Sequence, residues 1–141
     1  MQTMPSRNQL QEKAEHKLRI IKGHFREKEY DDVAENSGYV IEFGLKAAIC
    51  KHECTETYPD DKKYFVHNLE KLMRMANLSD SFELKKSTSA DFFANWSLIS
   101  KWSPEFRYQP IGMHDKNYAI QIINAIDNKS EGVFPWVKMN W

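Results

Sequence analysis

The stretch that decides the fold is SGYVIEFGLKAAICK, which runs from Ser37 to Lys51. Small and apolar side chains recur in and just before it at steps of three and four, as on one face of a helix; this face comprises Val33, Ser37, Val40, Gly44, Ala47 and Ala48. Glycine in a helix interior costs about 1 kcal/mol relative to alanine, so Gly38 and Gly44 require a close neighbour. We therefore expect a helix over about 31–53 whose small-residue face packs against the first helix of the chain.

Apolar residues at similar steps predict the other helices. Leu10, Ala14, Leu18, Ile21 and Phe25 predict the first helix, over about 8–29. Three more are expected over about 61–76, 89–101 and 115–128. The inner face of 61–76 should carry Phe65, Leu69, Leu72, Met73 and Ala76.

The remaining segments are interpreted as connections and a tail. Residues 77–88 are mostly polar and predict a surface connection, and Thr88 with Asp91 resembles a capping box that opens the next helix. The aromatic tail from Gly132 to Trp141 should pack back onto the helices. No segment alternates with period two, so the expected fold is all-α, an antiparallel up-and-down bundle of four to five helices.

Length and composition point to one folded domain. At 141 residues and 41% hydrophobic, the chain has material for a single core, and we expect one domain over 1–141. No apolar run approaches the roughly 18 residues of a membrane span, and the first residues do not resemble a secretory signal. With only two cysteines, a cytoplasmic location is expected.

Charge excludes one function class. Twenty basic residues balance twenty acidic ones, whereas a protein that holds nucleic acid by bulk electrostatics has a basic excess. Any contact with RNA must therefore be local.

A zinc site is a weak alternative. Cys50 and Cys54 lie near His52 in the sequence, and His67 could approach them, but no second Cys pair completes the usual spacing. Reduced, packed cysteines are the better interpretation, and we predict no metal site and no cofactor.

Three pieces in order resemble the HEPN superfamily, a family of small helical-bundle proteins from toxin–antitoxin and defence systems. SGYVIEFGLKAAI is similar to its second-helix core, FVHNLEKLM at 65–73 to its third-helix segment, and the stretch from Arg107 to His114 to its catalytic motif. The resemblance covers Tyr30 to about Ile126, and it implies one HEPN-like helical domain.

The family motif is an arginine and a histidine separated by four to six residues, and six separate Arg107 from His114. The resemblance implies metal-independent RNA cleavage by these two residues, in which a ribose 2′-hydroxyl attacks the adjacent phosphorus. His114 would move a proton and Arg107 would stabilise phosphoryl charge. Two such pairs meet when family members dimerise, so a homodimer is implied.

This chain departs from the motif in two ways. Tyr108 follows the arginine where active members usually have Asn, Asp or His, and Pro110 with Gly112 makes the intervening stretch a loop. The structural alternative is that Glu105 or helix carbonyls hold the arginine and that His114 caps the helix that follows.

Two further functions therefore stay open beside an endoribonuclease that acts as a toxin or phage-defence effector, controlled by an antitoxin. One is a non-catalytic module that binds a nucleotide or docks onto a nucleotidyltransferase, for which Tyr108 and Tyr118 are the candidate binding residues. Such partners modify a tyrosine at a His-x-Tyr position in some family members, which neither tyrosine occupies. The other is a helical adaptor without a site.

Overall fold

The computed structural model describes residues 3–141, and in this range it contains helices, turns and one isolated bridge between Ser6 and Thr57. The elements are α1 (Arg7–Arg26), α2 (Tyr30–Glu53), the 3₁₀ turn η1 (Lys62–Tyr64), α3 (Leu69–Met75), α4 (Ser79–Thr88), α5 (Ala90–Ile99), the 3₁₀ turn η2 (Pro104–Tyr108), α6 (Lys116–Asp127) and α7 (Val133–Lys138). The predicted all-α class is confirmed, with seven α-helices in the described range instead of four to five. None of these helices has the length and apolar character that crossing a membrane requires.

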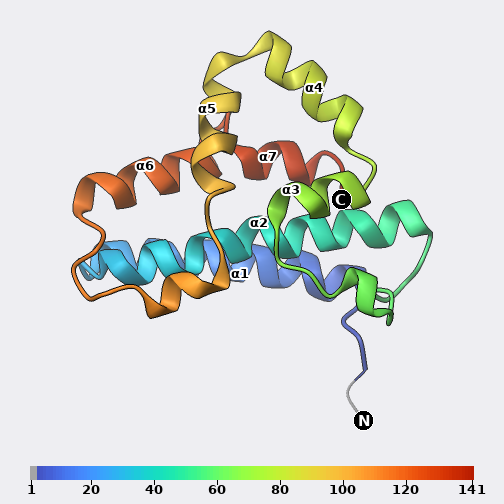
Figure 1. Cartoon of the computed structure of the whole chain (residues 1–141), viewed down its shortest axis with the longest axis horizontal. Helices are drawn as coiled ribbons and strands as arrows, with labels where there is room; N and C mark the ends of the chain where they lie inside the picture. The colour runs from blue at the N-terminus through green and yellow to red at the C-terminus, as the bar shows by residue number, and fades with distance from the viewer. Residues whose placement is uncertain (1–2) are drawn as a thin grey trace.

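The antiparallel pair of α1 and α2 forms the base of the molecule (Figure 1). Ser6 begins α1 with a capping box, because its hydroxyl accepts from the amide of Gln9 while the Gln9 side chain accepts from the amide of Ser6. Lys28 lies in the short turn that follows, with a left-handed φ of 61°. Helix α2 is the centre of the fold, since it also contacts α3, α6 and α7.

Both glycines of α2 are sites of close approach, as expected, but their nearest neighbours do not belong to α1. A Cβ atom on Gly38 would lie 1.8 Å from Cδ2 of Trp102, and one on Gly44 would lie 2.8 Å from Cγ1 of Val137. The prediction that the small-residue face packs against the first helix is therefore wrong at Gly44, the glycine that belongs to this face. The two glycines admit an indole ring and a side chain of α7 instead.

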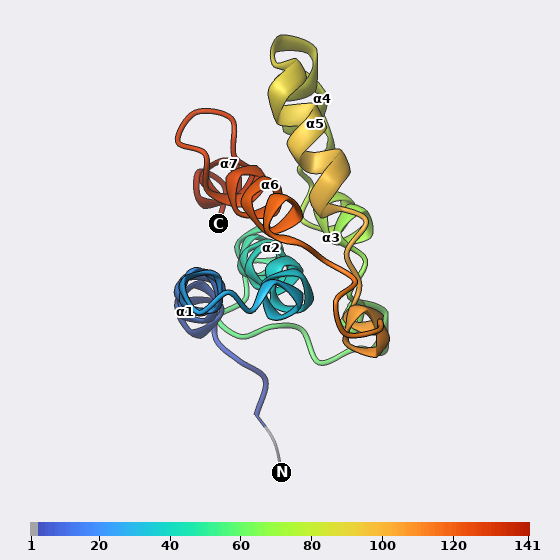
Figure 2. The same ribbon diagram turned by 90° about the vertical axis from the view of Figure 1, so that its left-hand side faces the viewer.

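Helices α4 and α5 stand out from the rest of the bundle (Figure 2) and are held by aromatic rings. Phe82 of α4 lies 5.2 Å from Trp96 and 6.1 Å from Trp136 of α7, measured between ring centroids. The prediction that 77–88 is a surface connection is wrong, because ten of its residues form α4. The expectation that the tail from 132 onward packs back is confirmed, since α7 contributes Val133, Phe134, Trp136 and Val137 to the core.

Two predicted helix starts are displaced. Ser89, not Thr88, caps α5 by accepting from the amide of Phe92 at 3.0 Å. The helix expected over 61–76 is replaced by η1, an irregular stretch and α3, which begins after the side chain of Asn68 accepts from the amide of Lys71. Phe65 falls in the irregular stretch and is 50% exposed, so its assignment to the inner face is wrong.

Candidate functional site

The segment that carries Arg107 and His114 runs over 103–115 and connects α5 to α6. It is anchored at its start by Trp102, whose indole N–H donates to the backbone carbonyl of Glu35 in α2 at 2.9 Å. Pro104 lies in the first turn of η2. Its fixed φ suits the start of a helix, and its missing N–H costs nothing there because the first amides of a helix have no intrahelical acceptor. The segment is therefore held against α2 where η2 begins.

Asp31, in the first turn of α2, anchors the other end of the segment. Its Oδ2 accepts from the amide of Gly112 at 2.7 Å, and its Oδ1 accepts from the amide of His114 at 3.0 Å. Gly112 has a φ of +87°, a conformation that glycine adopts without a Cβ penalty. The Gly112 amide and, to a lesser extent, the His114 amide lower the pKa of Asp31, so this carboxylate is ionised when it holds the loop.

The imidazole of His114 is held between two aromatic rings. Its centroid lies 5.7 Å from that of Phe106 and 4.4 Å from that of Tyr118, and its Nε2 lies 2.7 Å from Oε1 of Gln109. Because an amide oxygen only accepts, Nε2 carries the hydrogen and the neutral ring has its lone pair on Nδ1. Within residues 3–141, no hydrogen bond to Nδ1 is formed.

Arg107 is exposed at the end of η2. Its guanidinium lies over the ring of Tyr108, 5.0 Å from the centroid, and a hydrogen bond to the Tyr108 side chain raises the pKa of Arg107. No hydrogen bond or ion pair joins Arg107 to His114 or to Glu105 in the part of the chain that the structure describes. Asp115 caps α6 by accepting from the amide of Tyr118 at 2.8 Å, so the alternative in which His114 caps this helix is wrong.

The two tyrosines proposed as binding residues have different surroundings. Tyr118 is half-buried beside His114, and burial raises the pKa of its phenol. Tyr108 is 74% exposed and lies in an apolar stretch with Ile111, 100% exposed, and Met113, 58% exposed. We call these three residues the apolar rim.

The structure does not gather the residues considered for zinc. Cys50 is buried and Cys54 exposed, and His67 pairs with Glu42 of α2 through Nδ1 and Oε1 at 3.0 Å. Glu42 itself is buried and also pairs with Lys46 at 3.1 Å.

A different group of possible metal ligands lies at the turn between α1 and α2. Ligand atoms of His24, Glu29 and Asp32 lie within 4.8 Å of one another, the only such group in the described range. The nearest pair, His24 Nδ1 and Glu29 Oε2, is 3.4 Å apart. Close by, burial and the charges of Asp32 and Asp31 raise the pKa of Glu35. These donors suit one divalent cation, with water supplying its other ligands.

Sequence reasoning proposed Arg107, His114 and the two tyrosines as site residues but did not predict the residues that position His114 in the structure. Asp31 lies 83 residues before His114, and nothing local in the sequence connects the two. Gln109 and Phe106 lie only five and eight residues before His114. Their spacing fits neither a helix face nor a strand face, so the sequence does not predict that they contact His114. Any of the 20 acidic residues could accept hydrogen bonds from loop amides, so the sequence does not distinguish Asp31 from the others.

Comparison with protein-family models identifies the fold. The HEPN domain model matches residues 8–133, which is most of the chain. Comparisons with curated proteins and with solved structures give no match. On the strength of the family match, this chain belongs to the HEPN domain family.

Proposed function

We propose that this HEPN protein is a metal-independent endoribonuclease whose catalytic residues are Arg107 and His114. The observation that carries the proposal is the setting of His114: two rings and Gln109 hold its imidazole in one orientation and leave Nδ1 without a protein partner. A fixed imidazole with a free lone pair is what a general base requires. Arg107, seven residues before His114, is exposed and has no acidic partner within residues 3–141.

The reaction follows from these two groups. Nδ1 of His114 takes the proton of a ribose 2′-hydroxyl, whose oxygen forms a bond to the adjacent phosphorus while the bond to the 5′-oxygen breaks. The products are a 2′,3′-cyclic phosphate and a 5′-hydroxyl, and a protonated histidine returns the proton to the leaving oxygen. Arg107 stabilises the charge on the phosphoryl oxygens with its planar fork of donors.

Each copy of the 103–115 segment offers one histidine, His114, whereas the reaction uses a base and an acid. A homodimer that brings two copies of the segment together supplies both, and the apolar rim of Tyr108, Ile111 and Met113 offers a surface for such contact. Light scattering at micromolar concentration should give the mass of a dimer. A monomer mass would count against both the dimer and the ribonuclease.

An RNase of this kind harms the cell that makes it, so we propose a role as a toxin or phage-defence effector held in check by an antitoxin. Induced expression of the wild type should slow growth. Expression of the inactive variant His114→Ala should not.

The decisive test is RNA cleavage by purified variants. His114→Ala should abolish cleavage, and Arg107→Ala should reduce it at least about a hundredfold by removing charge stabilisation. His16 and Arg19, both exposed on α1, provide matched controls, and His16→Ala and Arg19→Ala should leave the rate unchanged. A chelator should not affect the wild type, because neither catalytic residue acts through a metal.

The second candidate is a non-catalytic module that binds a nucleotide or docks onto a partner such as a nucleotidyltransferase. The exposed apolar rim favours it, since a docking protein also requires an uncovered apolar surface. The exposed phenol of Tyr108 is accessible to a modifying partner, whereas Tyr118 is half-buried. If a folded wild-type dimer, free of antitoxin and unmodified on tyrosine, leaves RNA intact, this candidate replaces the ribonuclease.

A further inference from the structure

A pocket with an apolar floor lies away from His114, between the last turns of α1 and the outer face of α6. It has a volume of about 500 Å³, within the range of small-molecule sites. Helices α1 and α6 both pack on α2 and make few contacts with each other. Ile120, which lines it, is two residues after Tyr118 and so about 200° around the helix from the side that faces His114.

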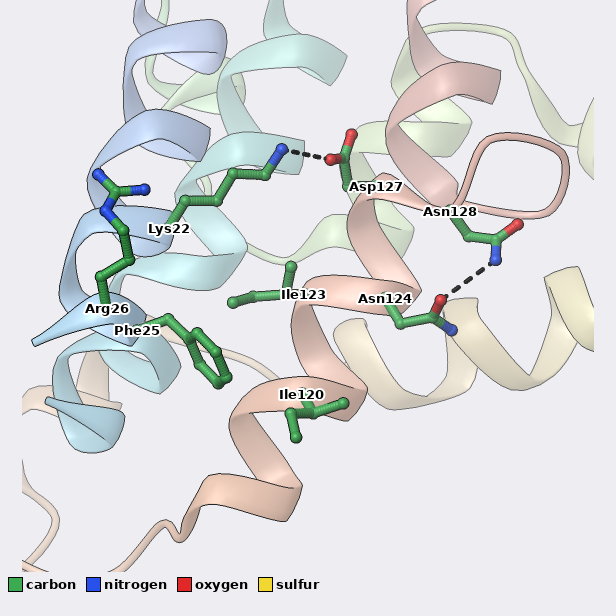
Figure 3. Close-up of a pocket in the computed structure, with 8 residues that line it drawn as sticks. All are labelled: Lys22, Phe25, Arg26, Ile120, Ile123, Asn124, Asp127 and Asn128. Carbon is green, nitrogen blue, oxygen red and sulfur yellow. Dashed lines mark hydrogen bonds and ion pairs between the residues drawn. The ribbon is translucent and has the colours of Figure 1, made fainter. Parts of the chain in front are cut away.

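The pocket has an apolar floor between two polar walls (Figure 3). Phe25 of α1 and Ile120 and Ile123 of α6 form the floor, and Ile120 is 46% exposed although it lies in a helix of the bundle. Asn124 of α6 and Asn128, directly after the helix, form one wall, and the side-chain amide of Asn128 donates to Oδ1 of Asn124 at 3.1 Å. A ligand with an apolar body would remove the apolar side chains of this floor from water, which favours binding.

The charges of the pocket leave one cation uncompensated. Lys22 crosses from α1 to α6 and pairs with Asp127, with Nζ and Oδ2 2.5 Å apart (Figure 3). Arg26, one turn further along α1, lines the pocket, and its guanidinium extends back along α1 toward Gly23 and away from Ile120 (Figure 3). Its side chain forms no hydrogen bond or ion pair within residues 3–141. Two cations and one carboxylate give a net charge of +1, which suits a ligand with a single negative charge.

We propose that this pocket binds a small organic monoanion, a carboxylate with an apolar body. The carboxylate pairs with the guanidinium of Arg26, which turns from its place along α1 toward the pocket and donates two parallel hydrogen bonds to the two carboxylate oxygens. The apolar body covers Phe25, Ile120 and Ile123. The amide N–H of Asn124, which donates no hydrogen bond in the described chain, can bind a polar substituent. The site is independent of RNA cleavage, because it lies on the opposite side of α6 from His114.

Calorimetric titration of the full chain tests this proposal with two probes, indole-3-acetate and octanoate, which distinguish an aromatic from an aliphatic body. At least one should bind with a dissociation constant of about 1 mM or below, the range for a ligand of this size. Indole-3-acetamide and octanamide, which keep the body and lose the charge, should bind at least about tenfold more weakly than their acids. This comparison requires no variant, so it holds even if a substitution disturbs folding.

Variants locate the site. Arg26→Gln should weaken binding of the carboxylate about tenfold, and Ile120→Asp, which puts a like charge on the floor, should abolish it. Arg19→Gln on the same helix is the matched control and should bind like the wild type, since Arg19 does not line this pocket. Equal affinity for acid and amide, or unchanged binding by Arg26→Gln, overturns the proposal. Tighter binding of adenosine monophosphate than of either carboxylate also overturns it, because the phosphate carries about two negative charges and the pocket offers one unpaired positive charge.

Discussion

Helix α2 and the segment over 103–115 are positioned in opposite ways. Thirteen of the 24 residues of α2 are buried, so neighbours on nearly every side determine where it lies. No residue of η2 is buried, and the segment around it is held by directed hydrogen bonds, from Trp102 to Glu35 and from two loop amides to Asp31. Substitutions in α2 should therefore lower stability, whereas substitutions in the segment and its anchors should change activity first.

The largest effect is expected where the two regions meet. In Gly38→Ala the new Cβ would lie 1.8 Å from Cδ2 of Trp102, so the indole must leave its place and lose its hydrogen bond to Glu35. We expect the free energy of unfolding to fall by about 3 kcal/mol or more, measured by urea denaturation.

Gly23→Ala is the matched control for that substitution. Its Cβ would meet only the Arg26 guanidinium at 3.6 Å, an ordinary contact, so alanine should stabilise α1 by up to about 1 kcal/mol. If both variants lose stability equally, the close approach of Trp102 is not what requires glycine at position 38.

An intermediate effect is expected at Asp31, which belongs to α2 but holds the segment. In Asp31→Asn the side-chain oxygen still accepts from one loop amide, and the NH₂ group cannot accept from the other. RNA cleavage should fall tenfold to about a hundredfold, because His114 is less well placed. The free energy of unfolding should fall by only about 1 kcal/mol at neutral pH.

The stability difference between wild type and Asp31→Asn should depend on pH in a definite direction. Folding lowers the pKa of Asp31, so its stabilisation is present above the unfolded-state pKa of about 3.9 and is lost as pH falls through the lower folded value. Denaturation curves at pH 7 should separate the two proteins, and curves in strong acid should bring them together. A gap that persists unchanged in acid would mean that the carboxylate charge does not hold the loop.

The smallest effect on stability is expected at the apolar rim. Ile111 is fully exposed, so Ile111→Ser should change the free energy of unfolding by less than about 0.5 kcal/mol. If the rim forms the dimer contact, the same substitution should shift the light-scattering mass toward the monomer. Leu84→Ser, at another exposed apolar position on α4, should leave the mass unchanged.

Much of the fold was predictable because long amphipathic helices repeat their signal over several turns. The positions of α1, α2, α5 and α6 follow from such repeats. Helix α4 was missed because it buries only Phe82, while its Leu84 is 68% exposed, so no apolar face is visible. The start of α3 was misplaced because Asp61 caps only the short turn η1, and Asn68 caps the helix.

The candidate site was predictable only as a pair of residues. The spacing of Arg107 and His114 is a feature of the sequence, whereas the position of their loop depends on a carboxylate 81 and 83 residues away. Contacts of that kind arise from the tertiary fold and have no local period. For the same reason, the pocket between α1 and α6 could not be inferred from either helix alone.

The pairing of α1 with α2 also has a consequence for the order in which the chain folds. These two helices are adjacent in sequence, so their contacts close a short loop and form early. The contacts of α2 with α6 and α7, and those of Asp31 with its loop, join distant parts of the chain and form late. We therefore expect a growing polypeptide to build its base first and to complete the Arg107–His114 loop only after Tyr118 of α6, which packs on His114, has been made.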